Sequence, residues 1–153
     1  MNFRCWLTAW IAGWATSVFL PSLWIAFLGL SAPVAVNGTG FSHLPGNSWQ
    51  VADDVGPAVK LMIGSLLLAG LLGLNRLLRR PPAARLLGGG VVGVAAVLTT
   101  IGFIPAGLSR GFALALAGER FDPTLSLIYL LGGVIGGVTM ILVADRCTRQ
   151  GRP

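Results

Sequence analysis

The sequence predicts an all-α integral membrane protein, a single domain in which four transmembrane helices form a bundle. Of its 153 residues, 54% are hydrophobic and only 10% are charged, whereas a soluble domain carries about 25% charged residues. Four nearly uncharged stretches of about 20 residues are each long enough to cross a bilayer. The 22 glycines have no collagen-like period and indicate close helix packing. This composition excludes a soluble enzyme.

The four expected spans cover residues 5–30, 57–78, 86–107 and 124–144. The first follows Arg4 as a secretory signal would, but its apolar run is long and no convincing cleavage site follows it, so we expect a retained helix. Pro21 should kink this helix. Two outer loops, a cytoplasmic loop and a tail complete the domain: 31–56, 108–123, 79–85 and 145–153.

Orientation follows from the basic residues, because cytoplasmic loops carry the excess of Lys and Arg. Eight of the eleven lie on one side of the predicted spans: Arg4, Arg76, Arg79, Arg80, Arg85, Arg146, Arg149 and Arg152. Lys60, Arg110 and Arg120 lie on the other. Both termini are therefore predicted to be cytoplasmic. The net charge of +6 reports this orientation, and we expect no nucleic acid partner.

The basic residues are ten arginines and a single lysine, a bias typical of high-GC bacterial genomes, so we expect a bacterial inner (plasma) membrane. The connection after the second span is too short for anything but an antiparallel hairpin of neighbouring helices. Its Arg79, Arg80 and Arg85 are expected to bind anionic lipid headgroups.

Small residues gather on one half of each of the last two spans. The fourth span contains two overlapping GxxxG pairs, Gly132/Gly136 and Gly133/Gly137, and the third contains Gly89 and Gly93. Small residues let helix backbones approach. We expect these six glycines to pack helices together and the third and fourth spans to be the tightest pair. Packing within one chain is favoured, and a face shared with another subunit is the alternative.

The first span carries Trp6, Trp10 and Trp14 at four-residue spacing. Interfacial anchoring and packing explain this stripe better than stacking on a flat cofactor, since no haem ligand lies nearby. We therefore expect no cofactor. Cys5 and Cys147 have no metal-site spacing and lie at the predicted cytoplasmic face, where thiols are normally reduced. No metal site is expected.

All five acidic residues lie outside the predicted spans or at their ends, which argues against an ion-coupled carrier. Apart from Arg76 at the cytoplasmic end of the second span, Lys60 is the one cation inside a span. We expect it to snorkel to the outer interface and pair with Asp53 or Asp54. The alternative places Lys60 at the mouth of a cavity. Candidate solute contacts are then Lys60, Thr99, Thr100 and Tyr129.

The first outer loop is the longest expected stretch without regular structure, and loops often carry function. Residues 34–41 contain Asn37-Gly38, which is typical of a short β-hairpin with a type I′ turn. His43, Asp53 and Asp54 are residue types found in hydrolytic sites. No spacing or nucleophile motif supports such a site, so no catalytic residue is assigned.

These observations favour a non-enzymatic polytopic membrane protein that acts through helix packing, as an accessory subunit or a small oligomer. Its partners are then the bilayer with its anionic headgroups and either a membrane protein or further copies of itself. Two alternatives stay open: a small transporter or channel for a neutral or anionic solute, and a lipid-headgroup enzyme that uses the first outer loop.

Overall fold

The computed structural model describes residues 3–30, 41–75, 81–103 and 122–150, and its regular elements there are all helical. Four helices are long and apolar enough to cross a membrane: α1 (Phe3–Leu28), α4 (Pro57–Asn75), α5 (Pro82–Phe103) and α6 (Pro123–Gln150). A 3-10 turn, η1 (Phe41–His43), leads into the shorter helix α3 (Leu44–Asp54). The prediction of an all-α protein with four apolar spans is confirmed.

Three segment boundaries differ from the sequence-based expectation. The first outer loop is partly helical, because η1 and α3 together occupy residues 41–54. Helix α5 begins at Pro82, inside the expected cytoplasmic loop, and α6 continues to Gln150 through most of the expected tail. The expected β-hairpin lies outside the described residues except for Phe41, which begins η1.

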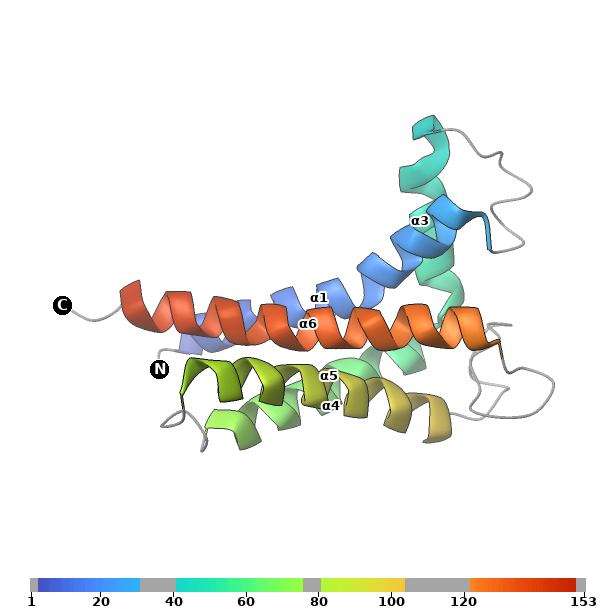
Figure 1. The fold of residues 1–153 in the computed structure, drawn as a ribbon. Helices are drawn as coiled ribbons and strands as arrows, with labels where there is room; N and C mark the ends of the chain where they lie inside the picture. Colours follow the sequence, from blue (N-terminus) through green and yellow to red (C-terminus); the bar gives the residue numbers. More distant parts are fainter. Residues whose placement is uncertain (1–2, 31–40, 76–80, 104–121, 151–153) are drawn as a thin grey trace.

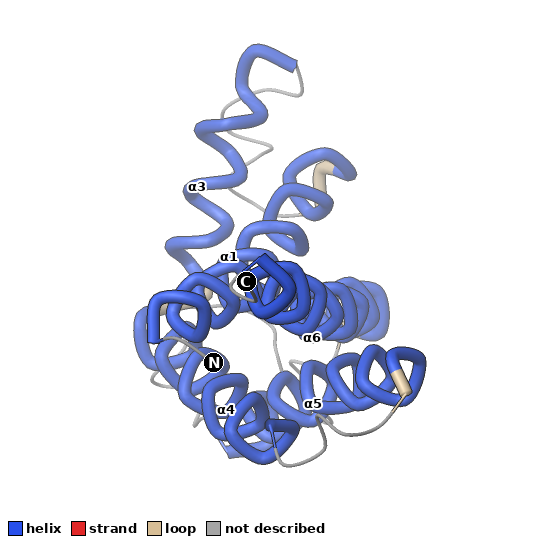
Figure 2. The backbone as a smooth tube through the Cα atoms, turned by 90° about the vertical axis from the view of Figure 1, so that its left-hand side faces the viewer, coloured by secondary structure: helices blue, strands red, loops and turns tan. Residues whose placement is uncertain are grey.

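The four long helices form a ring in which chain neighbours are antiparallel (Figures 1 and 2). Helix α6 packs against α1 and α5, and α4 packs against α5 and α1, so the last helix closes on the first. Both chain termini lie at one end of this bundle (Figure 1), which we call the terminal end. The opposite end, where α4 and α6 begin, is the α3 end.

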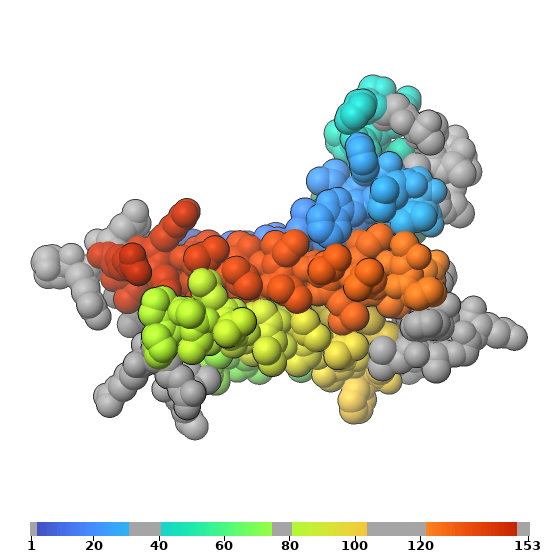
Figure 3. All heavy atoms as spheres, in the orientation of Figure 1, coloured from blue at the N-terminus to red at the C-terminus, as the bar shows by residue number. Residues whose placement is uncertain are grey.

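Helix α1 bends in its second half, so that its last turns leave the bundle (Figure 1). Pro21 lies inside this helix and cannot donate a hydrogen bond to the preceding turn, which explains the bend. The last turns of α1 and the crossing helix α3 form an arm that stands out from the side of the bundle (Figure 3).

Glycine and proline define the corner between α3 and α4. Gly56 has a φ of +82°, a conformation that a residue with a Cβ atom rarely adopts. Its backbone N–H donates to the Asp53 carbonyl at 2.9 Å, and Pro57 then opens α4, a position at which no backbone N–H is needed. The chain therefore stops one helix and starts another within two residues.

The start of α6 is capped by a carboxylate. The Oδ1 atom of Asp122 accepts hydrogen bonds from the backbone N–H groups of Thr124 and Leu125, at 2.8 and 3.1 Å. These groups have no partner within the helix, so the cap satisfies two of them. Pro123 fills the first helical position.

Large apolar side chains fill the ring and also cover its outside. Ile25, Leu67 and Met140 are fully buried, while others point outward: Leu61, Leu87, Val91, Phe103 and Leu127. An outer surface of exposed apolar side chains is suited to the hydrocarbon interior of a lipid bilayer.

Helix α6 makes its most extensive contact with α1 rather than with α5. The third and fourth spans are therefore not the pair with the most extensive contact, although their backbones meet directly at Gly93 and Gly133. The glycines of α6 pack against two neighbouring helices. Successive residues on a helix are rotated by about 100°, so adjacent glycines point toward different helices.

Candidate functional site

The corner where α3 meets α4 gathers charged and aromatic side chains in a pocket of about 310 Å³. It is lined by Trp49, Gln50, Asp53 and Asp54. All four belong to α3, whose other face buries Asn47, Val51 and Ala52. The helix is therefore amphipathic, with an apolar side toward the bundle and a polar side that forms the pocket.

Lys60 of α4 lies beside this pocket. Its Nζ is 3.7 Å from the Oδ1 of Asp53, and its side chain is 24% exposed while that of Asp53 is 62% exposed. The expected pairing of Lys60 with one of the two aspartates is therefore present. Such an exposed partner limits the stabilisation of the pair to about 1 kcal/mol or less.

Two tryptophans fix the position of Lys60 relative to α1. The Trp14 indole N–H donates to the backbone carbonyl of Lys60 at 2.9 Å, and the Trp10 indole N–H donates to that of Gly64 at 2.8 Å. The two rings stack with centroids 6.1 Å apart. The tryptophan stripe thus packs against α4. Trp14 lies near the middle of α1. The first turns of α4, which contain Lys60, are therefore level with the middle of α1 and not with its end.

A second polar group lies inside the bundle where α1 and α6 meet. The buried side chain of Tyr129 interacts with that of Ser22, and Asp54 acts on Tyr129 electrostatically. The Ser22 hydroxyl donates to the Val18 carbonyl at 2.8 Å. Ser126, one turn before Tyr129, is 7% exposed, and its hydroxyl has no hydrogen-bond partner among the described residues. Ser22, Ser126 and Tyr129 therefore form a buried polar group between α1 and α6.

The four expected solute contacts do not share one site. Lys60 pairs with Asp53 of the pocket and Tyr129 is buried on α6, but neither side chain lines the pocket. Thr100 is buried on α5 and its hydroxyl donates to the Ala96 carbonyl of its own helix at 2.7 Å. Thr99 is half-buried on the same helix.

His43 and the two aspartates also lie apart. His43 immediately precedes α3, whereas Asp53 and Asp54 end it. Ten residues of helix separate His43 from Asp53 by about 15 Å, so no hydrolytic arrangement forms among them. Among the described residues, no group of three or more His, Cys, Asp or Glu side chains is placed to hold a metal ion.

The chain matches no known protein family, no curated protein and no solved structure.

The two GxxxG pairs of α6 face different helices. A Cβ atom added to Gly133 would lie 2.7 Å from the Gly93 carbonyl oxygen of α5, and Gly137 lies against Gly89. Gly132 lies against Pro21 of α1. Gly136 lies against two small residues of α1, Gly13 and Ser17. All six glycines singled out in the sequence therefore stand at helix contacts within this chain.

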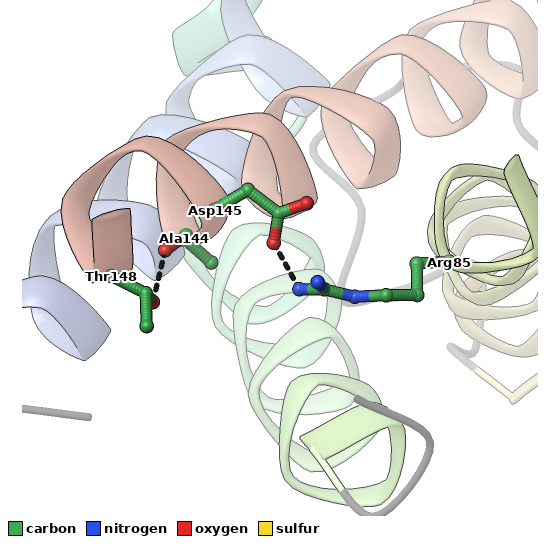
Figure 4. A network of polar contacts seen from close by, with 4 residues as sticks. All are labelled: Arg85, Ala144, Asp145 and Thr148. Atoms are coloured by element: carbon green, nitrogen blue, oxygen red, sulfur yellow. Dashed lines mark hydrogen bonds and ion pairs between the residues drawn. The ribbon is translucent and has the colours of Figure 1, made fainter. Parts of the chain in front are cut away.

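Arg85 is engaged inside the protein. Its guanidinium donates to the Oδ1 of Asp145, and both side chains are largely buried, at 18% and 16% exposure (Figure 4). Arg85, which the sequence predicts at the lipid headgroups, thus forms an ion pair that joins α5 to α6. Asp145 is 60 residues away in sequence, so sequence spacing gave no indication of the pair. Arg79 and Arg80 lie outside the described residues.

Cys5 and Cys147 form a disulfide, with their Cα atoms 5.6 Å apart. The expectation of two reduced thiols is therefore not met in this structure. The bond joins the start of α1 to the last turns of α6, at the terminal end. Two features could have suggested the proximity: both cysteines lie near the ends of apolar spans, and those ends are predicted on the same side of the membrane.

Proposed function

We propose that this protein is a non-enzymatic, multi-pass protein of a bacterial inner membrane that binds a small neutral or cationic solute at the α3–α4 corner and acts as a small transporter or channel. The observation that carries the proposal is the pocket of Trp49, Gln50, Asp53 and Asp54 beside helices that otherwise present apolar surface. Ionisable groups inside membrane spans are expensive and commonly mark a solute path, and Lys60, which pairs with Asp53 of this pocket, lies in the first turns of the span α4.

The charge of the pocket favours a cation over an anion. Lys60 pairs with Asp53, and Asp54 lines the same pocket as Trp49, whose ring stacks on Phe19 with centroids 5.9 Å apart. A carboxylate with an aromatic face suits an ammonium group. An anionic solute, which the sequence leaves open, would be repelled by the negative charge of Asp54.

Buried polar side chains between α1 and α6 offer the solute a route into the bundle. Tyr129 and Ser22 are buried between α6 and α1, and the hydroxyl of Ser126, one turn away on α6, has no hydrogen-bond partner among the described residues. We propose that these three residues, rather than Thr99 and Thr100, line the continuation of the path.

The orientation in this proposal follows from the arginines. Arg4, Arg85, Arg146 and Arg149 lie on the parts of α1, α5 and α6 at the terminal end, so this end is cytoplasmic by the positive-inside rule. The pocket then opens toward the periplasm. The remaining loop arginines, Arg79 and Arg80, bind anionic headgroups in this proposal.

Calorimetric titration of the purified protein in lipid nanodiscs with choline, glycerol and acetate tests the site. Choline should bind, and Asp54→Asn should weaken its binding about tenfold, or about 1.4 kcal/mol. Asp122→Asn is the matched control, because it makes the same chemical change at the α6 cap, where Asn also caps well. Equal binding of acetate, or an Asp54→Asn variant that binds choline normally, contradicts the site.

Transport requires a second measurement. Proteoliposomes should take up labelled choline, more slowly with Asp54→Asn than with Asp122→Asn. Binding without any flux contradicts the transporter function and leaves only a solute-binding protein.

A second candidate, an accessory subunit or small oligomer, is favoured by the arm. Large apolar side chains are exposed on the arm and next to it: Phe19, Leu23, Phe27, Phe41 and Trp49. The glycine faces no longer support this candidate, because they are occupied within the chain. Mass analysis after extraction in mild detergent tests it, and a strictly monomeric protein with no copurifying partner contradicts it.

A further inference from the structure

The disulfide between Cys5 and Cys147 closes the terminal end of the bundle. Cys5 lies in the first turn of α1 and Cys147 in the last turns of α6, and both side chains are half-buried. Their Cα separation of 5.6 Å is within the usual range for disulfides. Two residues before Cys147, Asp145 is held by Arg85 of α5. The end of α6 is thus fastened to both of its neighbours.

The two helix ends that the disulfide joins carry like charges. Arg4 on α1 and Arg146 and Arg149 on α6 are exposed, and the acid next to them, Asp145, is engaged by Arg85. Charges of one sign within a Debye length of about 10 Å repel each other. Helix ends also fray more readily than helix centres. The charges therefore favour separation of the two ends, and the covalent bond opposes it.

We propose that Cys5 and Cys147 form a reversible redox clamp on the cytoplasmic end of the protein. The oxidised pair holds α1 and α6 together, and reduction lets their arginine-bearing ends separate. This inference rests on the proposed orientation, because a thiol pair exposed to a reducing cytoplasm does not remain permanently oxidised. It is independent of the solute site at the α3 end.

The chemistry is a thiol–disulfide exchange with a protein dithiol–disulfide carrier. One cysteine thiolate attacks the carrier disulfide and forms a mixed disulfide, releasing one carrier thiolate. The second cysteine thiolate attacks the sulfur of the first and displaces the other carrier thiolate. The pair loses two electrons and two protons, the carrier gains both, and the reverse sequence reduces the clamp.

Thiol counting in inverted membrane vesicles tests the clamp. Vesicles holding the full-length protein are equilibrated with mixtures of reduced and oxidised glutathione, and free thiols are then tagged with a membrane-impermeant, mass-adding maleimide. We expect no tag under oxidising conditions, two tags under reducing conditions, and full reversal between them. Two tags in every mixture, or none in any mixture, overturns the proposal.

Hydrogen exchange then shows whether the bond changes the conformation. Amides of residues 3–8 and 145–149 should exchange about tenfold faster after reduction. The double variant Cys5→Ser/Cys147→Ser should exchange at the fast rate in both buffers. In about 1 M salt, where the Debye length falls to about 3 Å, the difference should shrink. Exchange that is the same in both redox states overturns the proposal, even if the thiols titrate.

Discussion

Gly93 of α5 and Gly133 of α6 lie backbone against backbone, so that neither position has room for a Cβ atom. A Cβ added to Gly133 would lie 2.7 Å from the Gly93 carbonyl oxygen, closer than packed atoms approach. The obstacle is main chain, which cannot rotate away as a side chain does. The distance between α5 and α6 is therefore set by the absence of side chains at these positions.

Gly93→Ala should destabilise the protein by about 1 to 3 kcal/mol, because the extra methyl group forces the two helices apart. Gly90→Ala is the matched control on the same helix. Its added Cβ would meet Val134 at 3.6 Å, which is ordinary contact, and Ala is the better helix former. Unfolding in mixed micelles measures both variants. A similar loss in the two would show that close approach at Gly93 does not matter.

The Arg85–Asp145 pair should contribute more than an exposed ion pair. Both side chains are largely buried, so removing one leaves the other charge without its partner. We expect Arg85→Ala to destabilise the protein by about 1 to 3 kcal/mol, between the values for exposed and buried pairs.

A double-mutant cycle with Asp145→Ala separates the pair from other effects. The second substitution should cost little once Arg85 is absent. Arg146→Ala serves as the control, because Arg146 is exposed on the neighbouring position of α6. Strictly additive losses would show that the two side chains do not stabilise each other.

Hydropathy predicted the four spans well because each is a long run of uncharged residues. In lipid the backbone N–H and C=O groups of such a run must bond to each other, which favours a helix. Helix α3 was missed for the opposite reason. Its sequence is short and polar, with Pro45 and Gly46 in the first turn, a pattern that favours a loop. Its helical state depends on burial of Asn47, Val51 and Ala52 against the bundle, which no local pattern contains.

The glycine pattern was sufficient to find contact surfaces but not to assign their partners. Gly132 and Gly133 are adjacent in sequence, yet the first meets α1 and the second meets α5. Sequence periodicity treated them as one face, since they share half of the helix circumference. Which neighbour each one meets is decided by how four helices close into a ring, and that depends on all the interfaces together.

The indole N–H groups of α1 should stabilise its contact with α4. Trp14→Phe keeps an aromatic ring against α4 but removes the donor to the Lys60 carbonyl. We expect a loss of about 1 kcal/mol, since that carbonyl also belongs to the hydrogen-bond ladder of its own helix. Trp49→Phe, at a tryptophan that is 66% exposed, is the control for stability. Equal and negligible losses in the two variants would contradict a role for the hydrogen bond.

The shape of the pocket should depend on the backbone conformation of Gly56 at the α3–α4 corner. Its φ of +82° costs a residue with a Cβ atom about 1 to 2 kcal/mol, so Gly56→Ala should destabilise the corner and shift α3 relative to α4. The pocket residues Asp53 and Asp54 lie within three positions of this glycine, and choline binding should weaken as well. Gly46→Ala is the control, because Gly46 has open space around it and no positive φ. Titration and unfolding are measured on both variants. Normal choline affinity in a destabilised Gly56→Ala protein would show that the pocket does not depend on this turn.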